Sequence, residues 1–135
     1  MLKTDIGKNY EEVAVKHLKK SGYKIIEQNY RLKVGEIDII AKDKKTLVFV
    51  EVKYRQSKEF GTPGEFVTVQ KQNKIIKTAL MYLKQNNIES DFRFDVISIC
   101  NDETEHIKNA FSPKLQNITF KILAEMKKHK NEIYV

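Results

Sequence analysis

The sequence predicts a single α/β domain, in which helices flank one central mixed sheet. Three observations predict it: the length of 135 residues, segments of helical periodicity that alternate with strand-like segments, and turn-forming residues between them. The composition agrees, because 41% hydrophobic and 32% charged residues is the balance of a folded globular chain. We therefore expect one domain over residues 1–135, with its core at about 5–111.

Three segments have the pattern of amphipathic helices. The first covers residues 6–20 and ends at Ser21-Gly22, where glycine can take the left-handed conformation. The second follows Thr68, the preferred N-cap, although Thr62 begins a capping-box sequence and is an alternative start. The third is a C-terminal extension at about 115–132. The apolar positions that predict the first two helices are Ile6, Tyr10, Val13, Ala14 and Leu18, then Ile75, Ile76, Ala79, Leu80 and Leu83.

The strand-like segments are short and rich in β-branched residues. Residues 23–32, 35–42 and 46–55 are joined by tight turns, which predicts a three-strand meander. A glycine- and proline-containing loop at 56–66 precedes the second helix. Residues 91–99 then alternate as a fourth strand, and residues 106–111 are a candidate fifth. The predicted order is helix, three strands, helix, strand.

Two of these strands carry charges inside apolar runs, where charged side chains are usually excluded. Side chains two apart on a strand share a face, so Glu36 lies with Asp38, and Glu51 lies with Lys53. If the two strands are neighbours, three carboxylates and one ammonium converge at the edge of a core. Such a cluster is costly unless a cation occupies it, and carboxylate ligands without nearby Cys or His suit Mg²⁺ or Mn²⁺. The alternative is a structural ion-pair network centred on Lys53.

The spacing of these residues resembles a known nuclease pattern. Asp38 followed thirteen residues later by Glu51-Val52-Lys53 is similar to the PD-(D/E)xK superfamily, which has the restriction-endonuclease-like fold. The segments GYKIIEQNYR, GEIDIIAKD, LVFVEVKYR, FGTPGE, RFDVI and HIKNAF, in this order, resemble the YraN family of uncharacterised bacterial proteins. The similarity covers roughly residues 7–111 and implies a restriction-endonuclease-like core related to archaeal Holliday junction resolvases.

The resemblance also implies roles for individual residues. Asp38 and Glu51 would ligate a Mg²⁺ or Mn²⁺ ion together with the carbonyl of Val52. Lys53 would position the attacking water, and Glu11 would approach the metal from the first helix. These four side chains, Asp38, Glu51, Lys53 and Glu11, are the expected catalytic set.

A second group is implied to flank the site or contact nucleic acid. Lys71 matches a lysine at the start of the family's second helix, where it could face phosphate. Gln70 or Gln72 could take the role of a glutamine found in related nucleases, and Glu36 would flank the site.

The charge of the chain fits a polyanionic partner. The formal net charge is +7, although this excess could serve solubility alone. Arg55 and Lys58, beyond the third strand, are candidates for the DNA backbone or for a solvated rim. A single cysteine, Cys100, and the lack of a signal-like or membrane-spanning apolar run predict a cytoplasmic protein without a membrane partner.

The leading hypothesis is thus a metal-dependent endonuclease that hydrolyses DNA, with branched or junction structures as candidate substrates. A symmetric four-way substrate would favour a homodimer. The alternative is a non-catalytic nucleic-acid-binding protein with a nuclease fold, and a third reading is a protein-interaction domain whose acids are structural.

Overall fold

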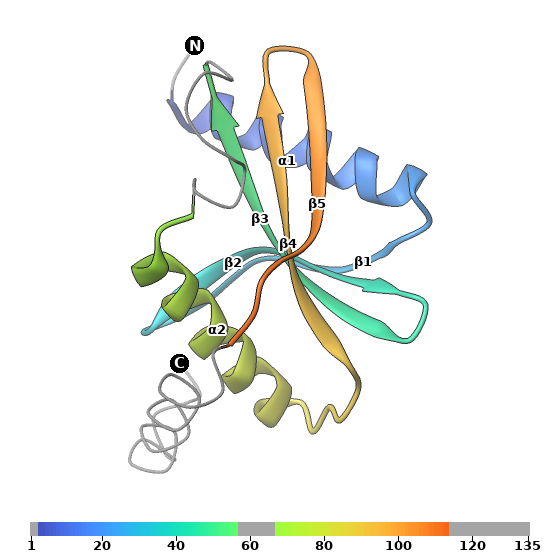
Figure 1. Ribbon diagram of the computed structural model, residues 1–135, viewed down its shortest axis with the longest axis vertical. Helices are drawn as coiled ribbons and strands as arrows, with labels where there is room; N and C mark the ends of the chain where they lie inside the picture. The colour runs from blue at the N-terminus through green and yellow to red at the C-terminus, as the bar shows by residue number, and fades with distance from the viewer. Residues whose placement is uncertain (1–2, 57–66, 114–135) are drawn as a thin grey trace.

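The computed structural model describes residues 3–56 and 67–113, which form a mixed five-stranded sheet with one helix on each face (Figure 1). The elements in chain order are α1 (Lys3–Lys20), β1 (Lys24–Leu32), β2 (Gly35–Asp43), β3 (Thr46–Arg55), α2 (Val69–Gln85), β4 (Phe92–Cys100) and β5 (Glu103–Phe111). The α/β class and all five predicted strands are confirmed. Lys58, the alternative start at Thr62, most of the 56–66 loop and the C-terminal extension lie outside the described residues.

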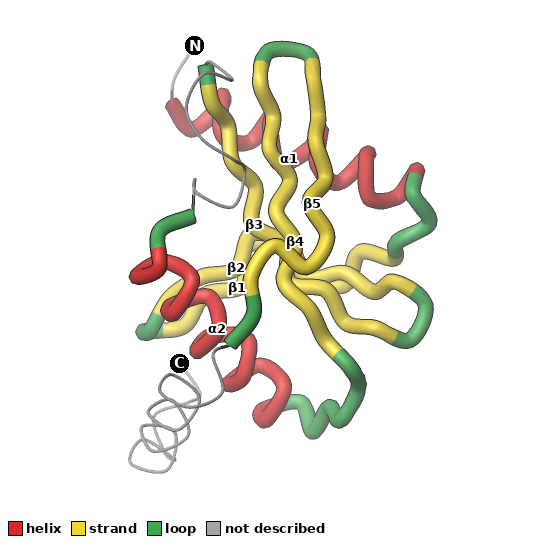
Figure 2. Tube along the Cα trace, viewed as in Figure 1, coloured by secondary structure: helices red, strands yellow, loops and turns green. Residues whose placement is uncertain are grey.

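The sheet has its strands in sequence order, β1-β2-β3-β4-β5. All neighbouring pairs are antiparallel except β3 and β4, which are parallel because α2 lies between them in the chain and returns it to the same end of the sheet. The tube in Figure 2 follows the predicted meander of β1, β2 and β3 and the final β4–β5 hairpin. No helix in the described part of the chain is long and apolar enough to cross a membrane.

Helix α1 covers one face of the sheet and passes behind β3, β4 and β5 in Figure 1. It buries Ala14 and Leu18 against the sheet, whereas Val13, expected on the apolar stripe, is 42% exposed. The helix ends as predicted: Gly22 has φ 90°, and the Tyr23 and Gly22 amides donate to the carbonyls of Leu18 and Lys19. This is a Schellman motif, in which only glycine takes the left-handed position without strain.

Helix α2 covers the opposite face. The Thr68 hydroxyl accepts a hydrogen bond from the Lys71 amide at 3.1 Å, which confirms the predicted N-cap. The buried face of the helix includes Ile75, Ile76 and Ala79 and packs on β2, β3 and β4. The two apolar clusters therefore lie on opposite faces of one sheet, and the central strands are buried between the two helices.

Strands β2 and β3 separate at one end, and this separation creates the space for a site. Their paired residues run from Asp43 opposite Thr46 to Ile39 opposite Val50. Beyond this point β2 continues to pair with β1, as far as Gly35 opposite Leu32. Gly35 also approaches α2 so closely that a Cβ there would come within 2.9 Å of the Thr78 Oγ1 atom. The start of β2 thus packs against α2 and does not pair with β3.

Candidate functional site

Asp38, Glu51 and Lys53 lie where β2 leaves β3, on the face covered by α2. Asp38 is the residue just before the last β2–β3 pair, and Glu51 is the residue just after it. On β3, Glu51 and Lys53 follow Leu47 and Phe49 at intervals of two, and the latter two belong to the core beneath α2. The predicted convergence of the two charged strands is therefore present in the structure.

Asp38 is anchored to the neighbouring strand by a backbone amide. Its Oδ2 atom accepts a hydrogen bond from the Val52 amide at 2.8 Å, so a side chain replaces the backbone acceptor where the two strands separate. Burial raises the pKa of Asp38 to about 7, and the negative charge of Glu51 adds to this effect. The hydrogen bond from Val52 opposes the rise without cancelling it. Two carboxylates thus repel each other in a poorly solvated place.

Glu51 is 4% exposed and is held by a lysine from the helix opposite. The Nζ atom of Lys71 lies 2.8 Å from its Oε1 atom, whereas the Nζ atom of Lys53 lies 3.9 Å from the same oxygen. The resemblance placed Lys71 toward phosphate, and the structure places it on a carboxylate. The site therefore contains two carboxylates and two ammonium groups.

The two lysines respond differently to this arrangement. Burial lowers the pKa of Lys53, and the charge of Lys71 lowers it further. Burial also lowers the pKa of Lys71, but its hydrogen bond to Glu51 and the charge of Glu51 outweigh burial, so the net pKa is raised. Lys71 is consequently the main counter-ion of Glu51, and Lys53 is a second, more loosely held cation.

Glu11 reaches toward the same region from α1, on the other face. Its Oε2 atom accepts a hydrogen bond from the Asn29 side chain at 3.2 Å. Burial raises the pKa of Glu11, the Asn29 hydrogen bond opposes this, and the charges of Asp38 and Glu36 raise it again. Glu11 is therefore within electrostatic range of the two β2 acids while a neighbour on β1 holds it in place.

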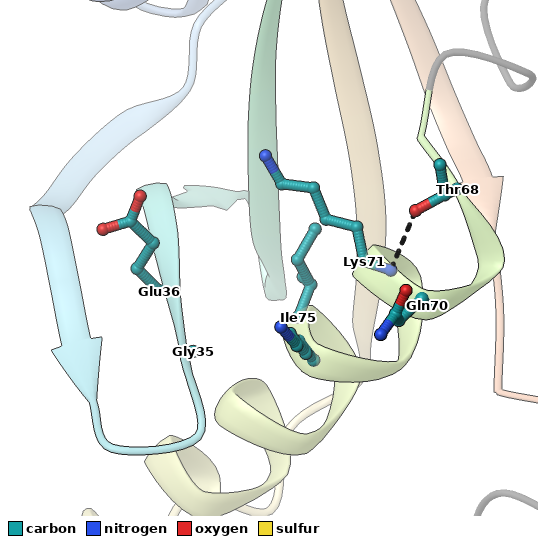
Figure 3. A pocket seen from close by; sticks show the side chains of 7 residues that line it. Gly35, Glu36, Thr68, Gln70, Lys71 and Ile75 are labelled. Atoms are coloured by element: carbon teal, nitrogen blue, oxygen red, sulfur yellow. Dashed lines mark hydrogen bonds between the residues drawn. The ribbon is translucent and has the colours of Figure 1, made fainter.

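A groove of about 420 Å³ opens beside these charges, between the start of β2 and the first turns of α2 (Figure 3). Its lining comprises Gly35, Glu36, Thr68, Gln70, Lys71, Lys74 and Ile75. Figure 3 shows Glu36 on the β2 side and Lys71 extending from α2 toward β3. The Glu36 carboxylate forms an exposed ion pair with Arg31 Nε at 2.9 Å. The negative charge on the β2 side of the groove is therefore partly neutralised.

The other residues proposed to bind nucleic acid are distributed differently. Gln70 is exposed and lines the groove, whereas the Gln72 side chain donates to the Val67 carbonyl at 2.9 Å and so fastens the start of α2. Gln70 is therefore better placed for a ligand. Arg55 lies 3.8 Å from Glu105 in an ion pair at the end of β3. Lys58 falls in the part of the chain that is not described.

Two residues near the site were not identified from the sequence. Lys74 lines the groove one helical turn after Lys71, a relation that helical spacing from Lys71 could have indicated. Asn29 holds Glu11, and its φ of 54° is unusual inside a strand. Nothing in its sequence context predicts this contact, because it joins residues 18 positions apart.

Two carboxylates, Asp38 and Glu51, are the side chains present that suit a hard divalent cation. Among residues 3–56 and 67–113, no three acidic, His or Cys side chains are already grouped as a metal site. Burial and, after it, the negative charge of Glu51 nevertheless raise the pKa of Asp38, and a cation between the two carboxylates would relieve their repulsion. Mg²⁺ and Mn²⁺ characteristically take one or two carboxylates and fill the remaining positions with water or substrate phosphate. The chemistry of this donor set therefore fits Mg²⁺ or Mn²⁺.

Comparison with known proteins identifies relatives over most of the chain. Residues 10–99 match the model of the uncharacterised protein family UPF0102. A UPF0102 protein of Sulfurihydrogenibium sp. (strain YO3AOP1) is 48% identical over 113 residues, which cover 83% of this chain and 98% of the relative. A UPF0102 protein of Clostridium botulinum (strain Hall) is 50% identical over a match that covers 79% of this chain and 94% of the relative. A UPF0102 protein of Persephonella marina is 50% identical over a match that covers 78% of this chain and 91% of the relative.

Proposed function

The chain belongs to the UPF0102 family, and we propose that it is a Mg²⁺- or Mn²⁺-dependent endonuclease of the PD-(D/E)xK type that hydrolyses DNA phosphodiester bonds. One observation carries the proposal: two electrostatically coupled carboxylates, Asp38 and Glu51, lie between diverging strands with the ammonium groups of Lys53 and Lys71 beside them. The restriction-endonuclease-like core is part of the proposal and is supported by the matching order of helix, three strands, helix and strand.

Each residue of the site has a distinct task in this proposal. Asp38 and Glu51 would hold the metal, with the Val52 carbonyl as a further ligand and Glu11 approaching from α1. The metal, when bound, would polarise the phosphodiester and acidify a water molecule. Lys53 would donate a hydrogen bond to that water or to a non-bridging phosphate oxygen, where its positive charge stabilises the charge that develops in the transition state. The apolar core beneath would keep these groups in fixed positions.

The lining of the adjacent groove favours the backbone of a nucleic acid as substrate. Lys71, Lys74, Gln70 and the Thr68 hydroxyl are groups that contact phosphate and sugar without reading bases. The net charge of +7 adds attraction for any polyanion. Branched DNA as the substrate, and a two-fold dimer that would match a four-way junction, rest on the resemblance to junction resolvases.

The second candidate is a non-catalytic nucleic-acid-binding protein. The 2.8 Å contact between Lys71 and Glu51 favours it, because a neutralised Glu51 needs no metal to explain its burial. The same groove would then bind nucleic acid without cleaving it. The two candidates differ in whether the carboxylates act on the substrate.

A cleavage panel tests the proposal. Labelled four-way junctions, flaps, single strands and plain duplex are incubated with the full chain in Mg²⁺, in Mn²⁺ and in EDTA. We expect metal-dependent cleavage that is lost in Glu51→Gln and Lys53→Met. Glu89→Gln is the matched control, because Glu89 is an exposed acid in the loop after α2. Cleavage by Glu51→Gln at the wild-type rate would refute the nuclease proposal.

Binding without cleavage would support the second candidate. In that case the wild type and Glu51→Gln should retain junction DNA equally well, and the affinity should fall steeply as salt increases.

A further inference from the structure

Lys71 occupies a position that its helix does not favour. It is in the first turn of α2, which contains no acidic residue, so its positive charge adds to the positive end of the helix dipole. Its Nζ atom is nevertheless only 2.8 Å from the Oε1 atom of Glu51, a carboxylate that is 4% exposed. The contact stabilises the charge of Glu51, which water stabilises in an exposed carboxylate. Lys71 thus provides at Glu51 the positive charge that a metal would provide.

Lys71 also belongs to the groove beside Glu51. Its side chain is 42% exposed and extends from the first turn of α2 (Figure 3). Lys74, one helical turn further along α2, also lines the groove. A phosphate in the groove would therefore be within the reach of two lysines on one helix face. Lys71 can therefore pair with either of two anions, the carboxylate of Glu51 or a substrate phosphate.

We propose that Lys71 is a displaceable counter-ion: it neutralises Glu51 in the free protein and moves to a backbone phosphate in the groove when nucleic acid binds, which frees Glu51 for the metal. This inference rests on the proposed function. It makes metal and nucleic acid bind cooperatively, because each ligand removes the obstacle to the other.

The cooperativity follows from charge and geometry. An ammonium and a divalent cation cannot both lie within about 3 Å of one carboxylate oxygen without strong repulsion, because little water separates them. A metal that binds alone must therefore displace Lys71 from its best partner. A phosphate that binds alone must draw Lys71 from Glu51 and leave that buried carboxylate without its main counter-ion. Coupling of this kind is reciprocal, and we expect a 5- to 50-fold effect in each direction, roughly the range of known allosteric couplings.

Lys53 is a less suitable counter-ion for this exchange. It is on the same strand as Glu51 and its Nζ atom is 3.9 Å from the carboxylate, so it contributes a weaker contact. Lys74 lines the groove, and we assign it to phosphate in both states. These differences supply the controls, because removing Lys74 removes one positive charge from the same helix face.

The experiment measures Mn²⁺ affinity by the loss of the free Mn²⁺ electron paramagnetic resonance signal. The proteins are wild type, Lys71→Met, Lys74→Met and Asp38→Asn, each with and without a four-way junction oligonucleotide at 4 °C. Denaturing gels verify that the oligonucleotide stays intact. Lys71→Gln is a second variant in case Lys71→Met does not fold.

We expect Lys71→Met without DNA to bind Mn²⁺ 5- to 50-fold more tightly than the wild type. DNA should raise the Mn²⁺ affinity of the wild type and change that of Lys71→Met little. Lys74→Met should weaken DNA binding while its Mn²⁺ affinity without DNA stays within about twofold of the wild type, which separates displacement from a general loss of charge.

Two negative outcomes are distinguishable. If the wild type binds Mn²⁺ at a site that Asp38→Asn abolishes, but Lys71→Met has the same affinity, the displacement is refuted and the nuclease proposal stands. If none of the proteins binds Mn²⁺ saturably, with or without DNA, the metal site fails and the displacement fails with it.

Discussion

Each face of the sheet holds a carboxylate near charged partners, half-buried Asp38 on one face and buried Asp95 on the other, and the pKa values of the two shift in opposite directions. Under α2, Asp38 has its pKa raised to about 7 by burial and by the charge of Glu51. On the α1 face, Asp95 in β4 is fully buried, yet its pKa is lowered. Burial alone raises the pKa of both acids. The difference therefore comes from the partners that each acid has.

Asp95 has a complete set of donors. Burial raises its pKa, but hydrogen bonds from His106, Arg93 and the Asn109 amide outweigh this. The distances are 2.8 Å to His106 Nε2, 3.0 Å to Arg93 Nε and 3.0 Å to the Asn109 amide. Arg93 also donates hydrogen bonds to Asp43 and to the hydroxyl of Tyr23, the residue just before β1, so the network joins this residue to β2, β4 and β5. Asp95 thus functions as a structural acid.

The site under α2 lacks such completeness. Among the described residues, Asp38 accepts one hydrogen bond, from the Val52 amide, and after burial the largest effect on its pKa is the negative charge of Glu51. The same sheet thus supplies Asp95 with hydrogen-bond donors, whereas Asp38 and Glu51 repel each other. Carboxylates that cost stability in the free protein are expected where a ligand will compensate them. This contrast is the physical reason to place function on the α2 face.

The largest effect should distinguish the two faces by activity. Glu51→Gln should reduce metal-dependent cleavage by at least 100-fold, because it removes a proposed metal ligand, while the protein stays folded. A quantitative single-turnover assay on the preferred DNA substrate, together with circular dichroism, checks both statements. A Glu51→Gln protein that fails to fold would make Glu51 a structural acid like Asp95.

The next effect should appear in stability. Asp95→Asn should lower the free energy of unfolding by about 3 kcal/mol, because it leaves Arg93 and His106 without their buried anion. Urea unfolding at pH 7 measures the change. Asp91→Asn, at an exposed position before β4, is the control and should change it by less than about 0.5 kcal/mol. Equal stability of Asp95→Asn and wild type would contradict the structural role.

A third effect depends on pH. The pKa of Asp38 is raised in the folded protein, so the folded state binds the proton more tightly and stability decreases as pH rises from about 4 to about 7. In EDTA, Asp38→Asn should therefore gain about 4 kcal/mol relative to the wild type between pH 4 and pH 8. Urea unfolding at several pH values tests this. A difference between the two proteins that does not change with pH would show that Asp38 is not strained.

The sequence predicted the elements well because their signals are local. Periodicity located both described helices and all five strands, and the caps at Thr68 and Gly22 followed from side-chain chemistry that acts within one turn. The convergence of Asp38 and Glu51 was also predictable, because a tight turn makes their strands neighbours and alternation puts both on one face.

The parts that could not be predicted depend on contacts between distant segments. The partner of Lys71 is 20 positions away, and nothing local distinguishes a lysine that faces phosphate from one that faces Glu51. The exposure of Val13 depends on how α1 crosses the sheet. Asp95 lies in an alternating strand, and the sequence around it does not indicate its network, which requires β5 to bring His106 beside it.

The smallest effects concern the helix ends that hold the two faces in place. Thr68→Ala should cost about 1 kcal/mol, because the Lys71 amide loses its acceptor at the start of α2. Gly22→Ala should cost a similar amount: its φ is 90°, although a Cβ there would meet nothing within 4 Å. Thermal unfolding measures both changes.

Although their costs are alike, these two variants should differ at the site. Thr68 positions the backbone of Lys71, so Thr68→Ala should also weaken junction-DNA binding severalfold, whereas Gly22→Ala, at the far end of α1, should leave it unchanged. Thr68→Ser keeps the acceptor oxygen and should restore both properties. If the two variants weakened DNA binding equally, the effect would come from general destabilisation. That result would contradict a DNA-binding site on the α2 face.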